Sequence, residues 1–249
     1  MFAFRRDPAE SGVPGVGVAF TDRHDGHSSG SYASLNLGRV GQDPAAPDNL
    51  ETLRTTLGLR SLMRVDQKHT AIAQLTTDNP DGSHRVPGEA DALVTTQPGV
   101  GLLIRVADCL PVLFASADGA VIGAAHAGRV GLLSGILPET VRLLREQHPA
   151  PAGPGAALRA WIGPHICGEC YEVPEQMRRE AAQILPATHA TTSWDTPAID
   201  LAAGAEQQLI GLDVAVEQVG ECTRTNPQNL FSHRVDADAG RQAGVIFRR

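Results

Sequence analysis

The sequence has 249 residues, of which 42% are hydrophobic and 20% are charged, a composition that is ordinary for a globular protein. The formal net charge is −7 and no run of basic residues is present, which argues against a nucleic-acid-binding protein. The sequence contains no run of about 18 apolar residues, which is the length that a membrane-spanning helix needs. Residues 1–10 lack the apolar segment of a signal peptide, so we expect a cytoplasmic protein.

Periodic and continuous apolar segments predict the secondary structure in chain order. Strands are expected at residues 16–21, 62–67, 101–107, 111–117, 120–125 and 213–219, and helices at 47–57, 132–148, 174–185 and 201–209. Because strands and helices are mixed without strict alternation, we predict an α+β fold, with mixed sheets flanked by helices. We expect a single domain spanning residues 1–249, in which the proline- and glycine-rich stretch 149–157 is a surface loop.

The four cysteines, Cys109, Cys167, Cys170 and Cys222, are too few for a disulfide scaffold. In a reducing compartment they act as thiols, metal ligands or nucleophiles. Cys167 and Cys170 form a C-x-x-C pair, but no second pair of ligands follows at zinc-finger spacing. We therefore predict neither a finger nor a redox function for them, and we predict that Cys222 packs without a partner.

A predicted hairpin places one cysteine beside one histidine. Asp118-Gly119 separates two apolar runs, as a two-residue hairpin turn does. Its register would place Cys109 opposite Gly128, two residues beyond His126. Side chains two apart on a strand share a face, so Cys109 and His126 should emerge together, roughly 7–8 Å apart at their Cα atoms. They could share a metal ion or act as nucleophile and base, whereas each alone could equally be a core residue.

The motifs around these residues resemble those of a known family. QKHT at His69, DALVTTQPGVGLLIRVADCLPVLF at Cys109 and AAHAG at His126 are similar to motifs of the laccase-domain, or polyphenol oxidase-like, proteins. These proteins are now regarded as zinc-dependent purine nucleoside phosphorylases. SGSYASLNLG, IGPHICGECYEV and LFSHRVDADAGRQAGVIF extend the resemblance over nearly the whole chain. From spacing alone, His69 would be one of nine histidines, so its assignment depends on this resemblance.

The resemblance implies a zinc ion held by His69, Cys109 and His126. Three protein ligands leave a position open on tetrahedral zinc, as catalytic sites do. The implied activities are phosphorolysis of adenosine, inosine, guanosine and methylthioadenosine to base and pentose 1-phosphate, and deamination of adenosine. Cys109, His126 and Asp108 are the predicted catalytic residues, with Asp108 and Asp91 either carrying protons or orienting a ligand histidine. Cu²⁺ could load in vitro, because it has the higher affinity for such ligands.

The expected partners are a purine nucleoside and phosphate, and phosphate needs cations or exposed amides. The predicted substrate-binding residues in the matching motifs are Arg23, Asn36, Ser232, Arg234 and Arg241. The sequence departs from the family pattern at Arg129, where tryptophan is usual, at His233, where tyrosine is usual, and at Thr70, where glycine is usual. None of these departures falls on a predicted metal ligand, but each is expected to affect the choice of nucleoside.

Three alternatives stay open at this point. A cysteine hydrolase or deamidase would use Cys109 as nucleophile and His126 as base without a metal. A copper-dependent phenol oxidase, which the older family name implies, would need an axial ligand such as Met63 or Met177, and neither lies in a matching motif. A metal-stabilised module that only binds nucleosides would show no turnover. The sequence leaves the oligomeric state open.

Overall fold

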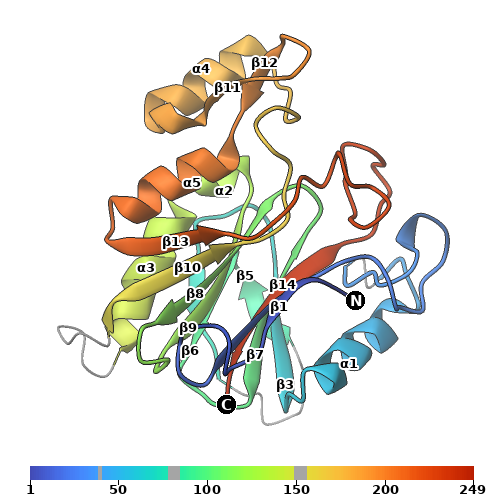
Figure 1. The fold of residues 1–249 in the computed structure, drawn as a ribbon, viewed down its shortest axis with the longest axis vertical. Coiled ribbons are helices and arrows are strands. Elements are labelled where there is room, and N and C mark those ends of the chain that lie inside the picture. Colours follow the sequence, from blue (N-terminus) through green and yellow to red (C-terminus); the bar gives the residue numbers. More distant parts are fainter. Residues whose placement is uncertain (39–40, 78–84, 149–155) are drawn as a thin grey trace.

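The computed structural model describes residues 1–38, 41–77, 85–148 and 156–249 (Figure 1). The strands are β1 (Phe2–Arg6), β2 (Val16–Thr21), β3 (Ser61–Asp66), β4 (Ala73–Leu75), β5 (Arg85–Glu89), β6 (Ala92–Thr95), β7 (Val100–Val106), β8 (Leu110–Ser116), β9 (Ile122–Ala127), β10 (Leu158–Ile162), β11 (His189–Thr191), β12 (Pro197–Ile199), β13 (Val214–Gln218) and β14 (Gln242–Arg248). The α-helices are α1 (Ala46–Thr56), α2 (Arg129–Leu133), α3 (Ile136–Gln147), α4 (Glu175–Ile184) and α5 (Leu201–Ile210).

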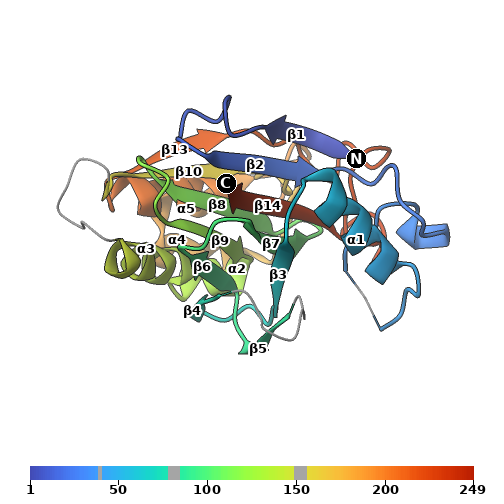
Figure 2. The same ribbon diagram turned by 90° about the horizontal axis from the view of Figure 1, so that it is seen from below.

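Two large mixed sheets pack face to face, with α1 against the first sheet and the other α-helices on the side of the second sheet (Figures 1 and 2). The first sheet has the order β1-β2-β14-β7-β3-β5, and the second has the order β13-β10-β8-β9-β6-β4. One apolar cluster lies between the sheets, a second joins the outer face of the second sheet to α3 and α5, and a third joins the first sheet to α1. The fold is therefore α+β with mixed sheets flanked by helices, as the sequence predicted.

The alternation of side chains along β8 explains why its sequence is apolar without a break. Val112 and Phe114 belong to the cluster beneath α3 and α5, while Leu113 and Ala115 belong to the cluster between the sheets. Successive side chains of a strand point to opposite faces, and here both faces are buried. A polar side chain at any position of this strand would be buried, so every residue from Leu110 to Ala115 is apolar.

The hairpin prediction is confirmed in its register. Leu110 pairs with Ala127 and Pro111 with His126, and Gly119 of the turn has a positive φ of 72°. The predicted helix at 132–148 corresponds to α3 together with the end of α2, and Gly135 at φ 92° separates the two helices. The expected loop at 149–157 lies mostly outside the described residues.

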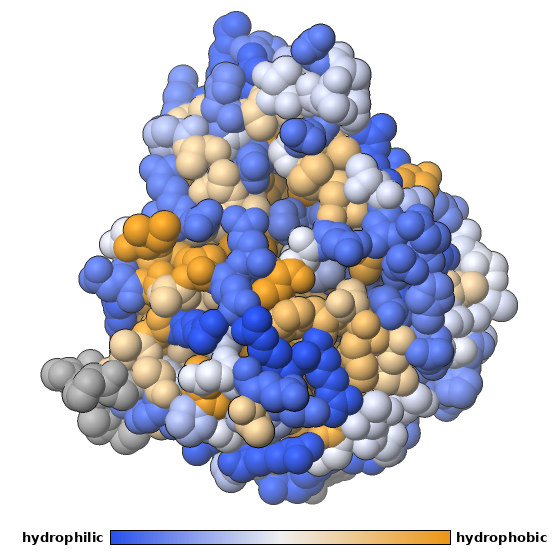
Figure 3. Space-filling model, in the orientation of Figure 1, coloured by the Kyte–Doolittle hydropathy of each residue, from blue (hydrophilic) through white to orange (hydrophobic). Residues whose placement is uncertain are grey.

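Several elements were absent from the prediction. Strands β1, β10 and β14 were not anticipated, although β14 lies between β2 and β7 in the first sheet. Among the described helices, none is long and apolar enough to cross a membrane. In the view of Figure 3 the surface is mostly hydrophilic, with hydrophobic colour gathered near α5 and β13, where Ile210 is 61% exposed.

Candidate metal centre

The open end of the β8–β9 hairpin brings Cys109 close to His126. Cys109 immediately precedes β8, and Gly128 immediately follows β9. A Cβ atom on Gly128 would lie 2.5 Å from His69 Cδ2 and 2.9 Å from Cys109 Sγ, so a side chain there would fill the space in front of the ligands. Because glycine at 128 has no side chain, the space beside His69 and Cys109 stays open.

His69 reaches the same point from the loop that follows β3. Its backbone is in the left-handed region, with φ 62°, which is uncommon for a residue other than glycine. The loop is held by one carboxylate, because Asp91 accepts hydrogen bonds from the amides of Lys68, His69 and Thr70 at 2.6–3.1 Å. These bonds fix a backbone conformation that the loop would not otherwise prefer.

The same carboxylate also orients His126. Asp91 Oδ1 lies 2.6 Å from His126 Nδ1, and the Asp91 side chain is completely buried. With Nδ1 engaged, Nε2 is the ring nitrogen that remains for a ligand. Asp91 thus positions both histidines, which is the orienting role that the sequence offered as one of two alternatives.

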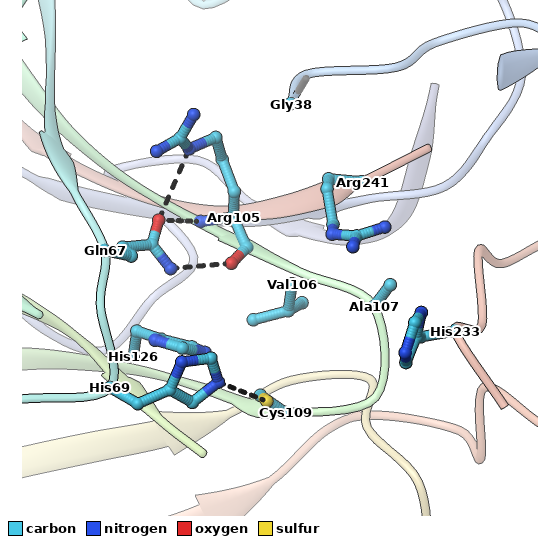
Figure 4. Close-up of a pocket in the computed structure, with 10 residues that line it drawn as sticks. All are labelled: Gly38, Gln67, His69, Arg105, Val106, Ala107, Cys109, His126, His233 and Arg241. Carbon is cyan, nitrogen blue, oxygen red and sulfur yellow. Dashed lines mark hydrogen bonds between the residues drawn. The ribbon is translucent and has the colours of Figure 1, made fainter. Parts of the chain in front are cut away.

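The three candidate ligands meet in a compact group (Figure 4). One ligand atom from each of His69, Cys109 and His126 lies within 4.8 Å of the others, and Cys109 Sγ lies 3.7 Å from His69 Nε2. The two imidazole rings are 4.7 Å apart and steeply inclined at 70°. Two imidazoles and a thiolate are ligands that suit zinc and also copper. The donor set and the open space before Gly128 therefore fit a single metal ion.

The group is strongly polarised even without a metal. Burial disfavours the thiolate of Cys109, but His126 and His69 outweigh it and lower the pKa of Cys109 to about 6. Burial likewise disfavours charge on His126, but the Cys109 thiolate and Asp91 raise the pKa of His126 to about 9. Between these values the pair is a thiolate and an imidazolium, so metal uptake at neutral pH must release the proton of His126.

A cavity of about 470 Å³ opens from the three ligands, a size that suits a small molecule. Besides the ligands, its lining residues are Gly38, Gln67, Arg105, Val106, Ala107, His233 and Arg241. In Figure 4 the ligands group on one side, with Arg105 and Arg241 across the cavity from them. The cavity therefore combines a metal-binding group with cationic side chains.

Among the predicted substrate-binding residues, Arg241 lines this cavity, and Asn36 holds the Arg241 backbone through a hydrogen bond. Asn36 is fully buried, and its Oδ1 accepts hydrogen bonds from the amides of Arg241 and Gly38. Its Nδ2 donates to Asp43. Asn36 therefore holds the backbone beside Arg241, and both ends of its side-chain amide are engaged in these bonds.

The other predicted substrate residues are not among those that line the described cavity. Arg23 donates to the carbonyls of Ala33 and Pro227 and stacks on the Phe231 ring. Ser232 is buried and accepts a bond from the Val235 amide. Each of these side chains contacts loop backbone, and its binding of substrate stays a prediction.

Arg234 and Asp108, the residue before Cys109, are joined by a hydrogen bond. Asp108 accepts bonds from the Arg234 amide and from Thr223 Oγ1, at 2.8 and 2.6 Å. The Arg234 guanidinium donates to the Glu172 carbonyl and stacks on Tyr171. Asp108 is not among the described residues that line the cavity, and its contacts hold the segment beside Cys109, while its part in the reaction stays a prediction.

Sequence reasoning missed Gln67 and Arg105 as cavity residues. Gln67 Oε1 accepts from the Arg105 amide at 3.0 Å, and Gln67 Nε2 donates to the Arg105 carbonyl at 2.8 Å. The Arg105 guanidinium also donates to the Val65 carbonyl. The sequence could have indicated Arg105 as a functional residue, because it is the one charged residue in the apolar run 101–107.

Fold and site together define an α+β protein with a candidate His–Cys–His metal centre at the edge of a cavity. The sequence model of the multi-copper polyphenol oxidoreductase laccase family matches residues 17–249, and the chain belongs to this family.

Similar proteins cover almost the whole chain. A Streptomyces coelicolor protein named purine nucleoside phosphorylase is 42% identical, over 94% of this chain and 96% of its own length. A Corynebacterium glutamicum protein with the same name is 37% identical, over 93% and 94%. Among solved structures, a Neisseria meningitidis protein superposes with a TM-score of 0.81 at 30% identity, covering 96% of this chain and 97% of its own. YlmD from Geobacillus stearothermophilus gives 0.83 at 28%, covering 100% and 98%.

Proposed function

We propose that the protein, as a single domain spanning residues 1–249, catalyses the phosphorolysis of purine nucleosides with a zinc ion held by His69, Cys109 and His126. The observation that carries the proposal is the convergence of these three ligands on a cavity that also contains Arg105 and Arg241. The relatives named purine nucleoside phosphorylase support the same reaction. Deamination of adenosine is a second reaction that we propose for the same site.

Different residues of the chain would bind phosphate and orient the metal ligands. Arg241 and Arg105 supply the positive charge that would hold phosphate in the cavity, through charge-assisted hydrogen bonds. Asp91 fixes the orientation of His69 and His126, so the ligand group needs little rearrangement. A zinc ion bound there would supply a Lewis acid with a coordination position left for substrate. Phosphate attacks the anomeric carbon as the bond to the purine nitrogen breaks.

The reaction can be tested with metal-analysed protein, inosine and phosphate. We expect hypoxanthine and ribose 1-phosphate in equal amounts, and no hypoxanthine when phosphate is left out. Adenosine without phosphate tests the second reaction, since only deamination would then yield inosine. Tight binding of inosine without any product would instead indicate a nucleoside-binding module.

Arg241→Ala should raise the KM for phosphate more than the KM for inosine. A hydrogen bond to a charged group contributes about 1.5–3 kcal/mol, so the expected rise is roughly 10- to 100-fold. Steady-state kinetics with each substrate varied in turn would measure it. Arg234→Ala is the matched control, because Arg234 contacts Glu172 and Tyr171 outside the cavity. An unchanged phosphate KM in Arg241→Ala would move the anion site away from Arg241.

The second candidate function is a metal-free cysteine hydrolase, which the polarised Cys109–His126 pair favours. In chelated protein, the rate of Cys109 alkylation should rise with the thiolate fraction and reach half its maximum near pH 6. His126→Ala should move this midpoint upward, toward about 8.5, the ordinary value of a thiol. Mass spectrometry of the Cys109 peptide separates its reaction from that of the other cysteines. Zinc should suppress the reaction at every pH, whereas rapid alkylation of the zinc-treated protein would support the hydrolase.

Copper-dependent phenol oxidation has less support from the arrangement of side chains. Blue-copper sites add a weak axial ligand, most often methionine, to two histidines and a cysteine. Met63 is fully buried in the core between the sheets, and Met177 packs against the core beneath α5. Neither is among the described residues that line the cavity.

A further inference from the structure

The three cysteines outside the candidate metal centre form a group of their own. The sulfur atoms of Cys167, Cys170 and Cys222 all lie within 4.8 Å of one another. The expectation that Cys222 packs without a partner was therefore wrong. The C-x-x-C pair has a third thiol beside it, supplied from a segment more than fifty residues later in the chain.

Two adjacent segments bring these thiols together. The segment after β10 carries Cys167 and Cys170, and the segment after β13 carries Cys222, and the two run side by side (Figure 1). They continue the parallel pairing of β10 with β13, through a bridge between His165 and Cys222. The Thr223 amide donates to the His165 carbonyl at 2.9 Å, which fixes this register.

The backbone around the group brings the thiols of the C-x-x-C pair together. The Cys167 carbonyl accepts from the amides of Cys170 and Tyr171, both at 3.0 Å, so the C-x-x-C pair closes a tight turn with both thiols on one side. The Cys167 amide points at Cys222 Sγ at 3.5 Å. An amide directed at sulfur favours a thiolate in that position, and thiolates are the form in which cysteine binds metals.

We propose that Cys167, Cys170 and Cys222 bind a thiophilic metal ion, either zinc(II) or copper(I), at a second site distinct from the His69–Cys109–His126 group. Three soft thiolate ligands select such ions. A disulfide would join two of the sulfurs and leave the third unused, whereas a metal ion uses all three. Cys170 is buried, while Cys167 and Cys222 are partly exposed, so the ion can enter from solvent.

The site would join two segments that hold the region beside Cys109. Thr223, next to Cys222, donates to the Asp108 carboxylate at 2.6 Å. The Ile166 amide, next to Cys167, donates to the Asp108 carbonyl at 2.9 Å. A metal bound by the three thiols would therefore fix these two contacts of Asp108 at once. The ion would stabilise this region, and its binding does not depend on the reaction proposed for the cavity.

The full-length Cys109→Ser protein gives a direct test. The chain has four cysteines, so this variant has no thiol outside the group. After reduction and removal of metal, zinc(II) titration should give one tightly bound equivalent that protects three thiols per chain from a thiol reagent. Cobalt(II) should give an intense sulfur-to-cobalt absorption band that zinc(II) then removes. Zinc held only by His69 and His126 would leave all three thiols reactive.

Cys222→Ser in the Cys109→Ser background should abolish both the thiol protection and the cobalt band. Thr225→Ala is the matched control, because Thr225 lies three residues away and contributes no sulfur. It should retain the metal. Circular dichroism of both variants shows whether the fold is kept, and thiol protection in the Cys109→Ser parent remains a test if Cys222→Ser does not fold.

A parallel titration with copper(I), against a competing chelator, identifies the ion. One tightly bound copper(I) with weak zinc(II) binding would support the site and assign copper to it. The proposal would be overturned if the reduced Cys109→Ser protein took up neither ion. It would also be overturned if protein purified without reductant carried a disulfide in this group and bound no metal after reduction. The experiment measures bound metal and thiol reactivity, so its outcome does not depend on whether the protein catalyses phosphorolysis.

Discussion

Cys109→Ser is expected to remove most of the bound metal from the His69–Cys109–His126 group and to abolish phosphorolysis. A neutral hydroxyl is a far poorer ligand than a thiolate. Loss of an outer partner of a ligand typically costs about 10- to 100-fold in metal affinity, and loss of a ligand should cost more. His69→Ala should behave in the same way, although His69 has no part in a two-residue thiol–imidazole mechanism. Competition with a zinc chelator of known affinity, in a Cys222→Ser background that lacks the second proposed site, would measure both losses.

His233→Ala is the matched control for His69→Ala. His233 also lines the cavity, but its Nδ1 contacts the Ala237 carbonyl and it does not belong to the ligand group. This variant should keep the wild-type zinc affinity. If His69→Ala bound zinc as tightly as His233→Ala does, His69 would not be a ligand.

The second large effect is expected at Asp91. Asp91→Ala would leave the amides of Lys68, His69 and Thr70 and the ring of His126 without their acceptor. An unpaired buried donor costs about 1–3 kcal/mol, and the His126 ring is buried while the three amides are partly buried, so the free energy of unfolding should fall by about 2–3 kcal/mol. The milder Asp91→Asn should lower zinc affinity by about 10- to 100-fold. Chemical denaturation and chelator competition measure the two effects separately.

Asp118→Asn provides the control at the other end of the same hairpin. Asp118 also contacts a histidine, His148, at 3.2 Å, and it accepts a bond from the Ala120 amide. It should lose some stability without any loss of zinc affinity. Equal zinc affinity in Asp91→Asn and Asp118→Asn would show that Asp91 does not position the ligands.

The part of the site that lies within one hairpin could be predicted from the residues. The Asp118-Gly119 turn sets the register, and the register places Cys109 and His126 at the same end. His69 could not be placed in this way, because its loop is fixed by Asp91, which precedes β6 and is distant in sequence. Its assignment came from the family resemblance.

The substrate residues show where motif position misleads. Arg23 and Arg241 both lie in motifs of the family, and each guanidinium donates to two backbone carbonyls. They differ in position, because Arg23 stacks on the Phe231 ring, whereas Arg241 lines the cavity. This difference depends on which side of a loop each side chain leaves, and sequence periodicity does not define that in an irregular segment. Cys222 was misjudged for a similar reason, since its partners come from another segment.

The most direct test of the account is the metal dependence of phosphorolysis. Hypoxanthine release from inosine and phosphate should be measured on the purified protein, after chelation, and after zinc is restored to the chelated protein in excess over the two proposed metal sites. We expect activity that is lost on chelation and recovered with zinc. Full activity in protein shown by elemental analysis to be free of metal would contradict the zinc site and would favour Cys109 as a nucleophile.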